Sequence, residues 1–385
     1  MNEHTNERNA QTTSNLARLL GYLREDPSNE RLRSDAVDEA VRQQEFEVAM
    51  TIVEGSPELM QPQWQHRKSL IALSLGDHES AHRISTELLA SGIDDPGVRY
   101  NAAYSALRLG LHETAAELAR PLLIGSELSS RALEILLRAM HHQDEVDDAL
   151  TLFRAYCEGG TLTAEALGVA SLIAVDGASF VEAEQWARRA IAQSPAQLEA
   201  HTALGTLLLG AQNTLNARVH LERALALSPL DGRVLSAIGF CELSDGALDA
   251  ARKRLTEATM GMPGHIGTWH GLGWCCIVQC DFVAAAHAFD TAISLDRNFA
   301  ESHGGAAVVK VLAGQSDEAR TLAGIALRLD ATCLSAAYAL ALLNGEATDA
   351  AAVERMATRI LKGRTATGGR NALADVIVRR IRSTS

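Results

Sequence analysis

The side chains best suited to chemistry in this sequence are cysteines that fall close together. Cys276 and Cys280 are spaced i, i+4, which puts both on one face of a helix, and Cys241 lies 34 residues before Cys275. Thiolates placed in this way could ligate Zn²⁺ or form a redox site. The alternative is that they pack as small apolar side chains, since the chain has no C-x₂-C pair of the zinc type. We favour packing and therefore expect no metal and no cofactor.

Two groups of cationic side chains could also bind ligands. His141 and His142 end a predicted helix, where they could ligate a metal or, as we favour, lie partly solvated at the negative end of the helix dipole. The tail beyond Glu354 is basic through Arg355, Arg359, Lys362, Arg364, Arg370, Arg379, Arg380 and Arg382. It could dock an acidic partner or lipid headgroups. The favoured alternative is a solvated face of a helix that caps the fold.

Composition and motifs exclude several classes of protein. The 385-residue chain has a net charge of −13, which disfavours nucleic-acid binding because that needs a basic surface. No apolar run reaches about 18 residues, so no membrane span is predicted. The polar N-terminus lacks the apolar stretch of a signal peptide. The sequence contains no Gly-rich phosphate loop, His-Glu-x-x-His or Gly-x-Ser-x-Gly motif. We expect a non-enzymatic, cytoplasmic protein.

The elements that would position these residues follow a 34-residue period. A ladder of alanines marks it, with 34 residues from each to the next after the first step of 32: Ala49, Ala81, Ala115, Ala149, Ala183, Ala217, Ala251, Ala285 and Ala319. Small residues such as Ser69 and Gly273 precede most of them by twelve positions, with Leu137 as the exception. Such small side chains let two helix backbones cross closely.

Each unit is predicted to be two amphipathic helices joined by a short turn. In the unit from residue 266 to 297 the helices are expected at about 268–278 and 282–295, because apolar residues recur there at i, i+3, i+4 and i+7. Pro195, Pro229 and Pro263 are placed to end second helices. One such hairpin cannot bury its apolar faces alone, so the units must stack.

These units resemble tetratricopeptide repeats. The best match combines Trp269-x₂-Leu272-Gly273 and Cys276 with Ala285-x₃-Phe289 and Ala292. A second unit supplies Leu204-Gly205, Ala217-x₃-Leu221, Ala224 and Pro229. The resemblance implies an all-α fold: a right-handed superhelical solenoid of antiparallel helix pairs.

The repeat pattern also predicts the organisation of the chain as one continuous array. Nine units are expected over residues 30–331, starting at Glu30, Pro62, Pro96, Ser130, Ala164, Leu198, Gly232, Ile266 and Ala300. A degenerate tenth unit is expected at 334–363. Residues 1–12 are predicted to be disordered, 13–26 to form an N-terminal capping helix, and 369–385 a basic C-terminal capping helix.

In this family the first helices line a concave groove, and the resemblance implies two zones of groove residues. One is an apolar strip with His270 beside it, in which Gly267 and Gly304 would leave room for the backbone of a bound segment. The strip consists of Phe240, Leu243, Trp274, Ile277, Val308, Val311, Tyr338 and Leu342. The alternative is that these side chains pack on each other.

The second zone is mixed and consists of Tyr100, Tyr104, Arg108, Arg131, Glu134, Arg138 and His141. Its arginines could hold a partner carboxylate by forked hydrogen bonds, or pair with Glu134 within one helix. The clamp that some family members use for chaperone tails needs Lys and Asn where this chain has Tyr100, Tyr104 and Ile135, which disfavours that partner.

We therefore expect an adaptor or chaperone that binds a segment of another protein in the groove, with Trp274 as an anchor. The regular, Ala-rich and Pro-poor repeats are typical of bacterial proteins. An alternative is a structural subunit that self-associates through its repeat ends or the apolar strip. A third hypothesis, an enzyme or metal sensor built on the cysteines, is the least favoured.

Overall fold

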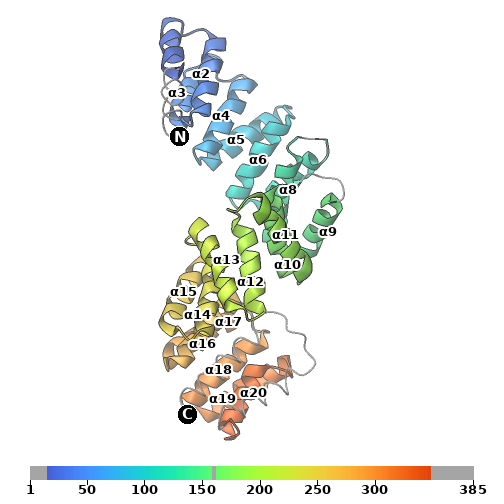
Figure 1. Cartoon of the computed structure of the whole chain (residues 1–385), viewed down its shortest axis with the longest axis vertical. Helices are drawn as coiled ribbons and strands as arrows, with labels where there is room; N and C mark the ends of the chain where they lie inside the picture. The colour runs from blue at the N-terminus through green and yellow to red at the C-terminus, as the bar shows by residue number, and fades with distance from the viewer. Residues whose placement is uncertain (1–14, 126, 158–161, 348–385) are drawn as a thin grey trace. The chain divides into compact units, whose positions relative to one another are not determined.

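The computed structural model describes residues 15–125, 127–157 and 162–347 (Figure 1). Every regular element in these ranges is a helix. Contacts divide the chain into two compact units, residues 1–170 and 171–385, where the repeat pattern alone predicted one array. The 34-residue period continues through the boundary, and a sequence period does not report how many contacts cross it. The basic tail, the C-terminal capping helix and most of the predicted tenth unit lie outside the described residues.

The first unit is built from helix pairs in which each helix packs against the next. Residues 15–25 form a helix whose Leu16 is buried against the first pair. The helices are α2 (Glu30–Arg42), α3 (Phe46–Glu54), α4 (Pro62–Ser74), α5 (His78–Ala90), α6 (Pro96–Arg108), α7 (His112–Ala119), the 3₁₀ turn η1 (Arg120–Leu123), α8 (Ser129–His142) and α9 (Val146–Cys157). Pro121 lacks an N–H donor, which explains why α7 gives way to a 3₁₀ turn.

The second unit continues the same arrangement. Helix α10 (Ala164–Asp176) contains the boundary between the units. It is followed by α11 (Phe180–Gln193), α12 (Leu198–Gly210), α13 (Thr214–Leu227), α14 (Gly232–Ser244), α15 (Leu248–Gly261), α16 (Ile266–Val278), α17 (Phe282–Leu295), α18 (Ala300–Leu312), α19 (Ser316–Leu329) and α20 (Leu334–Leu343). The prolines at 195, 229 and 263 follow α11, α13 and α15, as predicted.

The alanine ladder lies at the helix crossings. Each of its nine members is fully buried, and the facing small residues touch the opposite helix directly. The Ser69 hydroxyl donates to the Ala81 carbonyl at 3.3 Å. A Cβ on Gly205 would lie 3.4 Å from the Ala217 carbonyl oxygen. The buried crossings and the repeated helix pairs agree with the tetratricopeptide resemblance.

Side-chain volume is shared across each crossing. Where the first helix carries glycine, the second helix fills the space with a large side chain, as Leu221 does against Gly205 and Phe289 against Gly273. Where the first helix carries Ser69, the opposite residue is Ser85, and the two hydroxyls are 2.6 Å apart. Close packing of this kind keeps the hairpin geometry similar from unit to unit.

The turn inside each pair uses one left-handed residue at the same repeat position. Four of these residues are glycines and five are not: Gln44, Gly76, Gly110, Asp144, Ala178, Gln212, Gly246, Cys280 and Gly314, all with φ between 55° and 78°. A left-handed residue ends the first helix and reverses the chain toward the second.

Candidate functional site

A stacked pair of tyrosines on α6 forms the centre of the site that the structure supports best. The rings of Tyr100 and Tyr104 lie 6.2 Å apart at 16°. Both are half-buried, so part of each ring faces solvent. The ring of His78, at the start of α5, meets Tyr104 edge-on at 6.2 Å. An i, i+4 spacing on α6 sets the tyrosine stack, and the contact between α5 and α6 brings in the histidine.

The neighbouring first helix, α8, supplies the charges beside these rings. Arg138 Nε donates to Glu134 Oε1 at 3.2 Å, and about a third or less of either side chain is exposed. Burial raises the pKa of Tyr100; the charge of Glu134 raises it further and that of Arg131 lowers it. These influences place Glu134 and Arg131 near the Tyr100 hydroxyl, which stays protonated and able to donate.

The outer part of this surface carries arginines without carboxylate partners. Arg108 and Arg131 are exposed, and neither forms an ion pair with a described residue. Arg108 lies close enough to His78 to lower that residue's pKa, although burial lowers it more. We call the α6–α8 surface the set Tyr100, Tyr104, Arg108, Arg131, Glu134, Arg138 and His141. It offers two aromatic faces, a hydroxyl donor and forked cationic donors.

The residues of the predicted mixed zone thus lie together within the first compact unit, residues 1–170, because α6 packs against α8. Sequence reasoning missed His78, which belongs to a second helix. The repeat frame contained a signal for it, because a residue that starts a second helix can reach the next first helix, as His78 and His112 do. His112 occupies the same position one repeat later and also contacts the next first helix, but by parallel stacking on His142, with ring centroids 4.3 Å apart at 10°.

The predicted apolar strip in the second unit requires correction. Leu243, Trp274 and Val308 are 1%, 4% and 0% exposed, so these side chains are core residues and do not line an open surface. Trp274 packs edge-on against Phe289 at 6.0 Å and reaches Tyr338 at 6.5 Å. These three side chains are packed inside the protein, in line with the alternative prediction that the strip residues pack on each other. Phe240, Ile277, Val311, Tyr338 and Leu342 are half-buried around this core.

His270 is also part of the packing between units. It is 6% exposed, its Nε2 lies 2.8 Å from the Ser302 hydroxyl, and its ring meets Phe299 edge-on. A similar bond, 2.9 Å long, joins Ser236 to Thr268 one unit earlier. The space at Gly304 is filled by the start of α20, since a Cβ there would lie 2.7 Å from the Ala336 nitrogen. Gly267 would meet His265 at 3.0 Å. Neither glycine therefore provides room for a bound backbone.

The four clustered cysteines divide into three buried side chains and one turn residue. Cys241, Cys275 and Cys276 are buried. Burial raises the pKa of Cys241 to about 11 and that of Cys275 to about 12, which holds both as thiols. Cys280 is exposed in the left-handed turn. Among the described residues, no group of three or more His, Cys, Asp or Glu side chains could hold a metal ion.

A second pair of histidines links α12 and α13. Nδ1 of the fully buried His201 lies 3.0 Å from Nδ1 of His220, and its Nε2 lies 3.0 Å from the Pro195 carbonyl. Because that carbonyl only accepts, His201 carries its proton on Nε2, and His220 donates to His201 Nδ1. Through these contacts the pair anchors Pro195, in the connection between α11 and α12. The pair is therefore a structural feature and not a ligand site.

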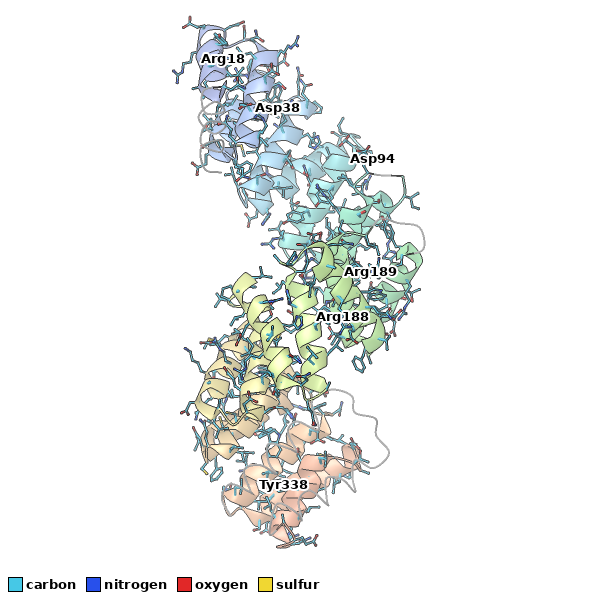
Figure 2. All side chains as sticks on the ribbon, in the orientation of Figure 1. Arg18, Asp38, Asp94, Arg188, Arg189 and Tyr338 are labelled. Atoms are coloured by element: carbon cyan, nitrogen blue, oxygen red, sulfur yellow. The ribbon has the colours of Figure 1, made fainter. Side chains whose placement is uncertain are left out.

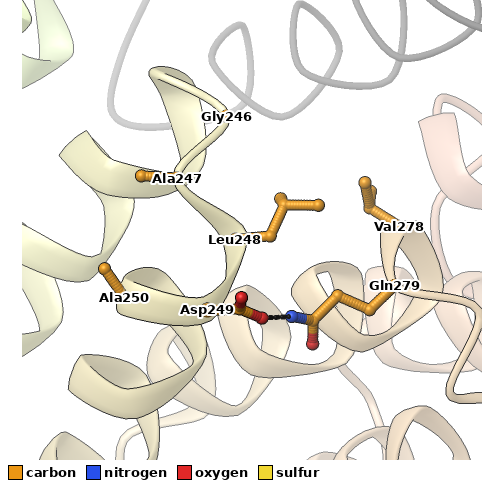
Figure 3. Close-up of a pocket in the computed structure, with 7 residues that line it drawn as sticks. All are labelled: Gly246, Ala247, Leu248, Asp249, Ala250, Val278 and Gln279. Carbon is orange, nitrogen blue, oxygen red and sulfur yellow. Dashed lines mark hydrogen bonds between the residues drawn. The ribbon is translucent and has the colours of Figure 1, made fainter.

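An open hollow of ≈ 670 Å³ lies between the α14–α15 turn and the end of α16 (Figure 3). Its walls include Leu248 and Val278. The Asp249 carboxylate in it accepts a hydrogen bond from Gln279 Nε2 at 2.8 Å, so its charge is already partnered. The hollow shows no feature that selects a ligand.

Across the described residues, no helix combines the length and apolar character needed to cross a membrane. No family model matches the sequence, and no curated protein is significantly similar to it. Several solved structures are similar. One is MamA, at 17% identity and a TM-score of 0.36, over 41% of this chain and 92% of that one.

Two other solved structures show the same kind of similarity. The APC/C hetero-tetramer Cut9–Hcn1 aligns at 14% identity and a TM-score of 0.45, over 95% of this chain and 86% of that one. PilF of Pseudomonas aeruginosa aligns at 20% identity and a TM-score of 0.41, over 52% and 92%. At these levels the similarity carries no information on function, and the fold assignment comes from the helix pairs of this chain.

Proposed function

We propose that this protein is a non-enzymatic scaffold that binds a segment of another protein on the α6–α8 surface. The observation that carries the proposal is the Tyr100–Tyr104 stack, which stays half-exposed beside arginines instead of entering the core. Tyr and Arg are enriched where proteins bind one another, because they combine large contact area with directed donors. Exposed side chains on two packed helices also form a firm platform.

The chemistry of the surface supports binding rather than catalysis. Tyr100 has a raised pKa and is neutral at physiological pH, so its hydroxyl is a donor and not a nucleophile. The buried Cys275 thiol, with its pKa raised to about 12, is equally unsuited to nucleophilic attack. The proposal extends to an adaptor of the cytoplasm, where free cysteines stay reduced.

Paired tyrosine variants test this proposal. Tyr100→Ala/Tyr104→Ala should retain helicity by circular dichroism and lose a protein that co-purifies with the wild-type chain from its host. Tyr22→Ala is the matched control, since Tyr22 is 55% exposed on the helix at residues 15–25, away from this surface. An unchanged set of bound proteins in the double variant would contradict the proposal.

Self-association is the alternative function, and light scattering separates the two. The predicted route through the apolar strip is disfavoured, because Leu243, Trp274 and Val308 are buried within one chain. A mass that stays monomeric as concentration rises supports the scaffold. A mass that doubles with concentration, and does so less in the Tyr100→Ala/Tyr104→Ala variant, would assign the α6–α8 surface to self-assembly instead.

A further inference from the structure

The α6–α8 surface carries two cationic groups, Arg108 and Arg131, that form no ion pair with the described residues. Some arginines elsewhere meet carboxylates: Arg218 Nη2 lies 2.7 Å from Asp245, and Arg252 Nη2 lies 2.7 Å from Asp281. Arg108 and Arg131 are exposed and make no such pair with a described residue. Two uncompensated guanidinium groups thus stand on adjacent first helices in a protein whose overall net charge is −13.

The acidic residue of this surface, Glu134, is already engaged. Glu134 accepts a hydrogen bond from Arg138 at 3.2 Å, which leaves three arginines on this surface against one glutamate. The tyrosine rings adjoin both arginines, since Arg131 acts on Tyr100, and Arg108 acts on His78, which contacts Tyr104. The faces of the two rings can cover apolar atoms of a ligand.

We propose that the segment bound by the α6–α8 surface is acidic: its carboxylates bind Arg108 and Arg131, and an apolar or aromatic side chain between them lies on the tyrosine pair. This inference rests on the proposed function. Guanidinium groups match carboxylates by two parallel hydrogen bonds. The neutral Tyr100 hydroxyl can donate to a third acceptor. The overall negative charge of the chain repels such a segment at long range, so attraction is confined to this surface.

The salt concentration determines whether the effect of these local charges on binding can be measured. At about 0.15 M salt the Debye length is about 8 Å, which screens the distant acidic residues more than the adjoining arginines. Binding should therefore be measured at this concentration and repeated at about 1 M, where contacts between exposed charges are largely screened. Affinity for an acidic segment should fall between the two conditions.

The probe is a short peptide with glutamates on both sides of a central phenylalanine. Matched peptides carry glutamine or lysine in place of every glutamate. Binding to the full chain is measured by calorimetry. The glutamate peptide should bind about tenfold more tightly than the glutamine peptide, and the lysine peptide should bind weakest. Equal binding of the glutamate and glutamine peptides would overturn the inference.

Two double variants locate the effect. Arg108→Gln/Arg131→Gln should lower affinity for the glutamate peptide about tenfold. Arg188→Gln/Arg189→Gln removes the same charge from the exposed face of α11 (Figure 2) and should leave affinity unchanged. An equal loss in both variants would show a general charge effect and overturn the inference. So would a single-stranded oligonucleotide that displaces the peptide at equal charge concentration, because the ligand would then be phosphate.

The tyrosine variant keeps this test separate from that of the proposed function. If Tyr100→Ala/Tyr104→Ala loses its host partner but no glutamate peptide binds the wild type, the scaffold stands and the acidic partner is overturned. If the glutamate peptide binds the tyrosine variant and the wild type equally, the arginines act without the tyrosine platform, and the proposed site is wrong.

Discussion

Gly273 on α16 lies directly beneath the ring of Phe289 on α17, and a Cβ at Gly273 would approach the ring atoms to 2.7 Å. Phe289 is fully buried and also packs against Trp274 and His270. A rigid ring held on several sides cannot move aside as a flexible side chain can. The glycine is thus needed for close approach and not for backbone freedom.

Gly273→Ala is expected to destabilise the second unit by about 1–3 kcal/mol, because overpacking against Phe289 outweighs the helix propensity gained. Gly210→Ala is the control: Gly210 ends α12 with nothing within 4 Å of a Cβ, so that change should stabilise slightly. Urea unfolding gives both values. A Gly273→Ala protein as stable as the Gly210→Ala protein would show that the ring adjusts freely.

The left-handed turn residues predict stabilising substitutions. Cys280 has φ 61° and an exposed side chain, so Cys280→Gly should raise the free energy of unfolding by about 1 kcal/mol by relieving backbone strain. The reverse change, Gly246→Ala, should lower it by a similar amount; φ there is +78° and no atom lies within 4 Å. Thermal unfolding of both proteins checks the pair. A Cys280→Gly protein that unfolds earlier than the wild type would indicate that the thiol makes a contact worth more than the strain.

Trp274→Ala should behave as a core deletion and not as the loss of a binding anchor. The side chain is 4% exposed among Phe289, Tyr338 and Val308, and removing it should cost about 3–5 kcal/mol. Binding per folded molecule should be unchanged, because the α6–α8 surface belongs to the other unit. If a Trp274→Ala protein had normal stability but bound its partner more weakly, Trp274 would be a binding residue and not a core residue.

Stability of the first unit should decrease as the pH falls below about 6.5. Burial lowers the pKa of His142, and the charges of His112 on α7 and of His141 and Arg138 on its own helix lower it further. The acidic residues around the start of α9, Asp144, Glu145, Asp147 and Asp148, are exposed and do not offset this. The unfolded chain then binds more protons than the folded chain, so the unfolding free energy falls from the unfolded pKa downward.

His142→Gln should flatten that pH dependence, whereas His287→Gln should not, because His287 on α17 is also exposed but contacts Trp269 and not a second histidine. Urea unfolding at several pH values between about 5 and 8 measures the slope. If the unfolding free energy changed with pH by the same slope in the wild type and in His142→Gln, the stacked His112–His142 pair would not be the source of the pH dependence.

The helix pairs and their crossings could be predicted because the fold repeats one packing rule. Ala81 and Ser69 stand at fixed spacing only because two backbones must approach there, and the structure buries both. The division into two units could not be predicted, since the spacing of Ala149 and Ala183 is the same across the boundary as elsewhere.

The candidate site was predictable only in part, for a physical reason. A repeat position says which way a helix residue points, but not whether the next unit covers it. Tyr104 and Trp274 share one repeat position, yet Tyr104 stays half-exposed while Phe289 and Tyr338 enclose Trp274. Large aromatic neighbours decide the difference: Phe289 lies on the second helix of the same pair, and Tyr338 lies two pairs later in the sequence.

Site-specific photo-crosslinking tests the central proposal most directly. A photoreactive phenylalanine analogue at position 104 should crosslink in the native host to one defined segment of another protein, and the same analogue at position 22 should not. Mass spectrometry of the crosslinked peptides identifies that segment, which we expect to contain Asp or Glu. Crosslinks from position 104 that match those from position 22, or that join only residues of this chain, would contradict a partner-binding surface on α6 and α8.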